Sequence, residues 1–274
     1  MSEQFLTLAT LGALSQQVRA QSWLWFLDID GTLLDIAPSP SAVEVPDDLS
    51  VSLDRLADNP CHHVALISGR SLADISRLFP SPLLSKSGNH GAEYFWNQKS
   101  WLHSSSQRFL AIRPQLLEAV APLTQQFPGL FIEDKRYSIS VHYRHVSPSL
   151  HPTLGNRINT LLSSLNDVVI YPAKLCWEIR PNPGPTKGDA VRTLYAKISP
   201  QLLSPIFPII IGDDRTDEDA FGAISPALTI HVGDGTTQAR YRLSSPRHVR
   251  ELVAAVSRDP HLAGNADHAH GDTV

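Results

Sequence analysis

Two aspartates, Asp28 and Asp30, lie two residues apart and are followed directly by a glycine and a threonine. Carboxylates this close repel each other unless a cation or a shared proton relieves them. An alternative interpretation is a helix cap or an Asx turn, both of which are common for aspartate after a strand. Taken alone, the pair leaves both interpretations open.

A second acidic cluster, Asp213, Asp214 and Asp217, favours the chemical interpretation. It also follows an apolar run, so up to five carboxylates are expected at one edge of a sheet. That density of negative charge requires a hard divalent ion, and Mg²⁺ prefers carboxylate oxygens together with a substrate phosphate. The two clusters therefore predict phosphate chemistry assisted by Mg²⁺.

Two further positions are suited to binding a phosphate. Lys187 begins a predicted helix, KGDAVRTLY, and a helix N-terminus beside a lysine attracts anions. Ser68 and Gly69, between a predicted strand and a helix, offer a hydroxyl and backbone N–H groups. We expect all of these groups to serve one anion.

The elements that position these residues are predicted from three apolar runs, at residues 23–27, 63–67 and 206–211. Continuous apolar strands that alternate with helices indicate a parallel sheet covered on both faces. Ligands bind such sheets beyond the carboxyl ends of the strands, which is where the polar residues lie. The fold class is therefore α/β, with a Rossmann-like parallel-sheet core.

The middle of the chain follows a different pattern. Apolar and polar side chains alternate over residues 139–144 and 174–180, which indicates strands with one packed face and one face open to solvent or ligand. Apolar residues at helical spacing between positions 154 and 165 offer cover for the packed face. A small α+β domain is the expected result.

These patterns predict a discontinuous domain organisation. Residues 1–109 and 183–258 form the core, and residues 110–182 form the inserted α+β domain. The boundary signals are the dipeptide Arg113-Pro114 and the turn-rich PNPGPT. Residues 259–274 have no periodicity and are expected to be a solvated, histidine-rich tail.

Composition excludes several classes of protein. The 274 residues carry 23 Lys plus Arg against 27 Asp plus Glu, a charge of −4 that argues against a nucleic-acid-binding surface. No apolar run is long enough to span a membrane, and residues 5–14 lack the basic flank of a signal peptide, so a short packed helix is expected there. Two distant cysteines indicate neither a metal site nor a disulfide scaffold, and a reducing cytoplasm is expected.

One motif mimics a cofactor site. GDGTTQ after residue 232 resembles part of a dinucleotide fingerprint but lacks its final glycine and its acidic partner. We interpret it as a tight loop beside the catalytic carboxylates.

Four motifs in sequence order, DIDGT, Ser68, Lys187 and GDDRTD, resemble those of the haloacid dehalogenase superfamily. The resemblance implies a nucleophilic Asp28 that forms an aspartyl-phosphate, and an acid and base at Asp30. The implied phosphate-binding side chains are Thr32, Ser68 and Lys187. The implied Mg²⁺ ligands are Asp28, the backbone carbonyl of Asp30, and Asp213, with Asp214 or Asp217 close behind.

The segments ISGRS, GNHGAE, IEDKRYSISVHYR, WEIRP and TKGDAV are similar to those of the trehalose-6-phosphate phosphatase family, over roughly residues 22 to 256. This resemblance implies hydrolysis of trehalose 6-phosphate, an inserted cap domain, and a functional link to a separate synthase, for which this chain is too short. The implied substrate contacts are Arg70, His90, Glu93, Glu133, Lys135, Arg144, Lys174 and Glu178. Polar faces on several strands of the inserted domain favour a lid over a merely solvated surface.

Three alternatives remain open at this stage. A related phosphatase would act on another sugar phosphate, such as a sucrose or mannosyl-glycerate ester. A phosphomutase would return the phosphoryl group to the sugar. A sugar-phosphate sensor without catalysis would have no need for the acid and base Asp30.

Overall fold

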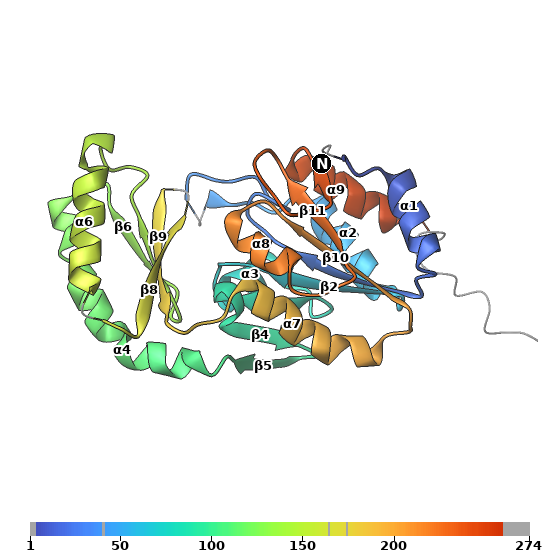
Figure 1. Ribbon diagram of the computed structural model, residues 1–274, viewed down its shortest axis with the longest axis horizontal. Helices are drawn as coiled ribbons and strands as arrows, with labels where there is room; N and C mark the ends of the chain where they lie inside the picture. Colours follow the sequence, from blue (N-terminus) through green and yellow to red (C-terminus); the bar gives the residue numbers. More distant parts are fainter. Residues whose placement is uncertain (1–3, 40–41, 164, 174, 260–274) are drawn as a thin grey trace, which may run out of the picture.

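The computed structural model describes residues 4–39, 42–163, 165–173 and 175–259, which form two separate sheets (Figure 1). In the larger sheet six neighbouring strands are parallel to one another. Each of the two strands after them runs antiparallel to the strand before it. The order is β12 (Tyr241–Leu243), β11 (Leu228–Val232), β10 (Ile206–Gly212), β1 (Ser22–Leu27), β2 (His62–Ile67), β3 (Ser85–Gly88), β4 (Glu93–Trp96) and β5 (Lys99–Leu102).

The central strand β1 is buried along its whole length. Trp23 and Trp25 pack on one face of the sheet, while Leu24 and Phe26 pack on the other. β1 lies between β10 and β2 and is parallel to both, so the three apolar runs pair as predicted. The α/β prediction is confirmed.

Helices cover both faces of this sheet. The apolar cluster on the first face draws on α1 (Leu8–Gln17), α2 (Asp47–Asp58), α3 (Leu72–Leu78) and α9 (Pro246–Val256). The cluster on the second face draws on α7 (Lys187–Ile198) and α8 (Arg215–Phe221). The predicted N-terminal helix is α1, which Thr7 caps and which buries Leu11 completely.

The smaller sheet has the order β6-β7-β9-β8 and is antiparallel throughout. Its strands are β6 (Phe131–Asp134), β7 (Ile139–His142), β8 (Val168–Ala173) and β9 (Cys176–Pro181). The accompanying helices are α4 (Ser105–Val120), α5 (Leu123–Gln126) and α6 (His151–Leu162). Short 3₁₀ helices lie between these elements: η2 (Asn89–Gly91), η3 (Pro148–Leu150) and η4 (Ser199–Gln201).

Alternation along these strands separates two faces. Ile139, Val141 and Ile179 pack with Leu154 of α6 and Leu116 of α4 in a core of their own. The opposite face carries polar side chains and looks towards the larger sheet (Figure 1). The predicted period of two is confirmed, because each strand places alternate side chains on opposite faces.

The boundary signal at Arg113-Pro114 is wrong. Pro114 lies inside α4, because proline removes one N–H donor from a helix without necessarily ending it. Phe109 on the same helix is fully buried in the core of the smaller sheet. The smaller sheet and its helices span residues 105–181, which we call the smaller unit, and the predicted domain bounds of 110–182 stay a prediction.

Among the described residues, no helix has both the length and the apolar character needed to cross a membrane. The predicted tail lies outside the described residues from position 260 onwards.

Candidate active site

The carboxyl ends of β1, β10 and β2 bring the acidic motifs together. Leu27 is paired with Ile211, and the N–H of Asp28 donates to the carbonyl of Ile211 at 3.0 Å. Because the two strands end level with each other, Asp28 and Asp213 lie at the same edge of the sheet. One carboxylate oxygen from each of Asp28, Asp213 and Asp217 lies within 4.8 Å of the others.

Lys187 lies between two of these carboxylates. Its Nζ is 2.7 Å from Oδ1 of Asp28 and 2.8 Å from Oδ1 of Asp217. Burial alone would lower the pKa of Lys187, but Asp217 and Asp28 hold it well above its ordinary value. Lys187 is the first residue of α7, whose N-terminus is fixed by a capping box between Thr186 and Asp189.

Three carboxylates around one ammonium group leave an excess of negative charge. Burial raises the pKa of Asp28 and of Asp217, against the opposing effect of Lys187. Burial, with repulsion from Asp28 and Asp214, raises the pKa of Asp213 to about 8. A divalent cation would relieve this repulsion, and oxygen-only donors are the ligands that a hard cation selects. The residues present therefore fit a divalent metal.

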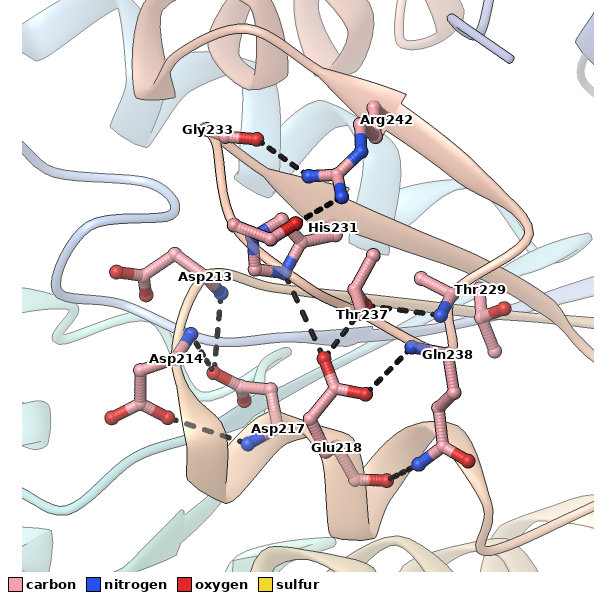
Figure 2. Close-up of polar contacts among 12 residues, drawn as sticks. Asp213, Asp214, Asp217, Glu218, Thr229, His231, Gly233, Thr237, Gln238 and Arg242 are labelled. Carbon is pink, nitrogen blue, oxygen red and sulfur yellow. Dashed lines mark hydrogen bonds and ion pairs between the residues drawn. The ribbon is translucent and has the colours of Figure 1, made fainter. Parts of the chain in front are cut away.

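Asp217 is the third carboxylate of the cluster formed with Asp28 and Asp213. Oδ2 of Asp217 accepts from the N–H groups of Asp213 and Asp214 at 3.2 and 3.1 Å (Figure 2). Asp214 caps α8 and accepts from the N–H of Thr216 at 2.7 Å. Burial raises the pKa of Asp214, but Lys187 and Thr216 outweigh burial and hold it below its usual range. Asp214 is thus the helix cap of α8, a role that the sequence had suggested for Asp28 and Asp30, and its predicted place near the metal stays a prediction.

Thr32 binds the carboxylate of Asp213. It is fully buried, and its hydroxyl donates to Oδ1 of Asp213 at 3.3 Å. The adjacent Gly31 has φ +87°, and a Cβ there would lie 2.1 Å from Oδ2 of Asp213. Thr32 does not line the cavity. The structure thus connects it to the metal cluster, while its predicted contact with phosphate stays a prediction.

Ser68, Arg70 and Asp30 form the second side of the site. The guanidinium group of Arg70 holds Asp30 through two hydrogen bonds, of 2.6 and 2.7 Å, and also pairs with Asp74. Burial opposes the charge on Arg70, but Asp30 and Asp74 raise its pKa above the ordinary value. Ser68 is buried, and its Oγ accepts from the N–H of Arg70 at 3.2 Å. The predicted acid and base is thus bound to a predicted substrate residue.

A cavity of about 1050 Å³ lies between the two sheets. On one side it is lined by Asp28, Asp30, Ser68, Arg70, His90, Lys187, Asp213 and Asp214. On the other side it is lined by Glu133, Lys135, Arg144 and Glu178. The structure therefore gathers most of the predicted site residues around one space.

Glu178 is the central residue on the side of the cavity that the smaller sheet forms. Its carboxylate lies 2.7 Å from Nε2 of His90 and 2.9 Å from Nζ of Lys135. Burial raises the pKa of Glu178, but His90 and Lys135 hold it well below the usual value. Glu133 is paired with His142 at 2.8 Å on the same face. The carboxylates of Glu133 and Glu178 are thus held by neighbouring side chains, as rigid recognition of hydroxyl groups requires.

Of the predicted substrate residues that the structure describes, one does not line the cavity. Glu93 does not line it, and its Oε1 accepts from the N–H of Leu72 at 3.0 Å and from Nδ2 of Asn89 at 2.6 Å. Oε1 of Glu93 is therefore occupied by two donors near the turn η2, and the predicted contact of Glu93 with substrate stays a prediction. Lys174 lies outside the described residues.

The loop after β11 borders the cavity, as predicted for GDGTTQ. Asp234 lines the cavity, between Gly233 and Gly235, which both have positive φ. Glu218 accepts from Thr237 Oγ1 at 2.6 Å and thereby holds the far side of this loop (Figure 2). This role of Glu218 was not predicted, because nothing in its spacing distinguishes it from other helix-surface acids.

Other cavity residues were also missed. Tyr171, on the edge strand β8, is 39% exposed and has the Arg180 guanidinium 3.7 Å from its ring centre. Extending the alternation from β9 to β8 would have found Tyr171. Cys176 is a free, buried thiol whose pKa burial raises to about 12, so the cavity gains no nucleophile from it.

Comparison with known proteins identifies the family. Residues 26–247 match the sequence model of the trehalose-phosphatase family. The chain belongs to the trehalose-phosphatase family. The predicted resemblance is confirmed, and the chain is a phosphoric monoester hydrolase of this family.

Relatives with curated names agree. The trehalose-phosphate phosphatase of Mycobacterium tuberculosis strain H37Rv is 31% identical over 267 residues, covering 94% of this chain and 67% of that protein. The trehalose-phosphate phosphatase of Mycobacterium leprae is 32% identical over 274 residues, covering 94% of this chain and 62% of that protein. This trehalose-phosphatase family member thus spans about two thirds of the length of these relatives.

Solved structures agree with the fold. A trehalose-6-phosphate phosphatase related protein has a TM-score of 0.76 at 30% identity, covering 85% of this chain and 96% of that one. The C-terminal domain of the C. albicans trehalose-6-phosphate phosphatase has a TM-score of 0.79 at 24% identity, covering 93% and 98%. Phosphatases of this fold use a divalent metal, in agreement with the cluster of Asp28, Asp213 and Asp217.

Proposed function

We propose that this trehalose-phosphatase family member hydrolyses trehalose 6-phosphate to trehalose and phosphate, as a step of trehalose biosynthesis. The observation that supports this most directly is the composition of the cavity between the two sheets. Asp28 and Lys187 line its floor, and Glu133, Lys135 and Glu178 line the facing sheet. The floor is suited to a phosphoryl group, and the facing side chains offer charged partners for many hydroxyl groups.

In the proposed mechanism, a carboxylate oxygen of Asp28 attacks phosphorus, and the bond from phosphorus to the sugar oxygen breaks. Asp30 donates a proton to that leaving oxygen. Asp30 then removes a proton from a water molecule, whose oxygen attacks the aspartyl-phosphate and releases phosphate. Asp28 is restored as a carboxylate at the end of the cycle.

Lys187 and Ser68 assist by binding the transferring phosphoryl group. Lys187 already lies 2.7 Å from Asp28, so it also keeps the nucleophile in place. Arg70 restrains Asp30 until the substrate competes for its guanidinium group. We propose Mg²⁺ as the metal, held by Asp28, the carbonyl of Asp30 and Asp213 with Asp217 behind; it would neutralise charge on the phosphoryl oxygens.

We propose that the unit of residues 105–181 acts as a cap over the core formed by the chain on either side of it. The polar face of its sheet forms the wall of the cavity that faces Asp28 and Lys187. Closure of this unit over the core would therefore exclude bulk water. The substrate itself would come from a separate trehalose-6-phosphate synthase, and both enzymes would work in the cytoplasm.

The test of the substrate is phosphate release across a panel of trehalose, sucrose, mannosyl-glycerate and glucose phosphates, with and without Mg²⁺. We expect kcat/KM for trehalose 6-phosphate to exceed that for every other ester by at least about tenfold, since unmatched buried charges penalise the wrong sugar. Free trehalose and phosphate should appear in equal amounts, which a phosphomutase would not give. A higher kcat/KM for a monosaccharide phosphate would contradict the proposal.

Binding of the metal should depend on pH. The pKa of about 8 keeps Asp213 protonated at lower pH, and a protonated carboxyl does not bind a cation. The Kd for Mg²⁺ should therefore tighten by up to about tenfold per pH unit from pH 6 to pH 8 and level off above that range. Calorimetric titration measures this, and the dependence should be weaker in an Asp213→Asn variant. A Kd that does not change with pH would count against Asp213 as a ligand.

A further inference from the structure

The turn η2 has an unusual backbone that the proposed mechanism does not use. Asn89 and His90 have φ values of 48° and 55°, so two consecutive residues other than glycine are in the left-handed region. The N–H of Asn89 donates to the carbonyl of Arg70 at 2.7 Å, and that of His90 donates to the carbonyl of Ser68 at 3.0 Å. Strained residues of this kind persist where surrounding contacts determine them. The turn is thus fixed to the predicted phosphate-binding loop.

The side chain of Asn89 is buried and makes three hydrogen bonds. Nδ2 donates to Oε1 of Glu93 at 2.6 Å and to the carbonyl of Lys135 at 3.1 Å. Oδ1 accepts from the hydroxyl of Ser138 at 2.6 Å. Glu93 therefore helps to orient the side chain of Asn89.

The two partners of Asn89 in the smaller unit are the two ends of one hairpin. Lys135 and Ser138 enclose the turn between β6 and β7, and the N–H of Lys135 donates to the carbonyl of Ser138 at 3.0 Å. From this hairpin the ammonium group of Lys135 reaches the carbonyl of Gly69 at 3.1 Å and Glu178 at 2.9 Å. Asn89 thus connects the core directly to the hairpin from which Lys135 projects.

We propose that Asn89 is a positioning residue that sets the four-stranded sheet at a fixed orientation over the phosphate-binding loop. The buried amide connects a rigid turn of the core to a hairpin of the facing unit, so the distance from Asp28 to Lys135 and Glu178 depends on this joint. Asn89 itself does not line the cavity. The inference rests on the proposed function only in requiring a sugar ester as substrate.

The test variant is Asn89→Gly. Glycine adopts the left-handed conformation freely, so the turn is preserved while the side chain that joins the two units is removed. For trehalose 6-phosphate we expect KM to rise and kcat/KM to fall by at least about tenfold, because misplacement of binding groups is costly. For a small aryl phosphate, which does not need the facing sheet, kcat/KM should change by less than about threefold.

A second variant removes the other partner of the hydrogen bond between Ser138 and Asn89. Ser138→Ala removes one hydroxyl without changing the backbone and should reduce kcat/KM for the sugar phosphate in the same selective way. Combined with Asn89→Gly, its effect should not be additive, because both act on one hydrogen bond. The matched control is Asn97→Gly: Asn97 has the same φ of 48° but lies in the exposed β4–β5 turn. It should leave kcat/KM for both substrates unchanged.

Two results would overturn the inference. Either Asn89→Gly retains kcat/KM for the sugar phosphate within about twofold, or it loses activity on the aryl phosphate to the same extent. If the wild-type enzyme prefers a different sugar phosphate, the proposed substrate is wrong, and the same comparison is made with the preferred sugar ester. Failure of the proposed function and failure of this inference are therefore distinguishable.

Discussion

Replacing Asp28 with asparagine should lower kcat for trehalose 6-phosphate by more than about a thousandfold, because an amide cannot form the covalent intermediate. The same loss is expected for an aryl phosphate, since Asp28 attacks phosphorus whatever the leaving group. Folding should be preserved: the carboxyl is buried among like charges that raise its pKa, and asparagine removes one of those charges. Steady-state kinetics and thermal unfolding measure the two outcomes.

The matched control is Asp219→Asn. Asp219 is an exposed aspartate on α8 that lines the same cavity and has no assigned role. Its replacement should change kcat by less than about threefold. A kcat of the Asp28→Asn enzyme comparable to that of the wild-type enzyme would show that Asp28 is not the nucleophile.

Glu178→Gln should produce the second-largest effect, and a selective one. The carboxylate lies 2.9 Å from Lys135 and 2.7 Å from His90, and glutamine leaves both partners without their anion. For the sugar phosphate we expect kcat/KM to fall by about a hundredfold, since sites built around buried polar groups discriminate strongly. For an aryl phosphate, kcat/KM should fall by less than about threefold.

Glu118→Gln is the corresponding control, because Glu118 is exposed on α4, on the helical side of the same unit. It should leave both substrates unaffected. Equal losses on both substrates in Glu178→Gln would make Glu178 a structural residue of the interface and not a recognition residue.

The central strands and the acidic site were predictable because they depend on local patterns. Apolar runs such as residues 23–27 have one stable environment, the middle of a sheet covered on both faces, and their polar ends must meet at one edge. The alternation around Ile139 and Val141 likewise determined which face would pack. Asp28, Asp213 and Lys187 follow directly from these elements.

The remaining features depend on contacts between distant segments. Pro114 resembles a boundary, yet the contacts of Phe109 and Leu116 with the smaller sheet keep α4 continuous across it. The orientation of Glu93 depends in part on the N–H of Leu72, which lies 21 residues earlier in the sequence. No periodicity carries such information, because a carboxylate binds whichever donor the tertiary structure brings nearest.

The site of phosphorylation during turnover tests the proposed mechanism most directly. Enzyme that is hydrolysing trehalose 6-phosphate is quenched in acid, digested and analysed by mass spectrometry for an acid-stable acyl phosphate. We expect a phosphoryl group on the peptide that contains Asp28, and none on the corresponding peptide of the Asp28→Asn enzyme. A phosphoryl group on any other residue, or none on an enzyme trapped in mid-turnover, would contradict the proposed mechanism.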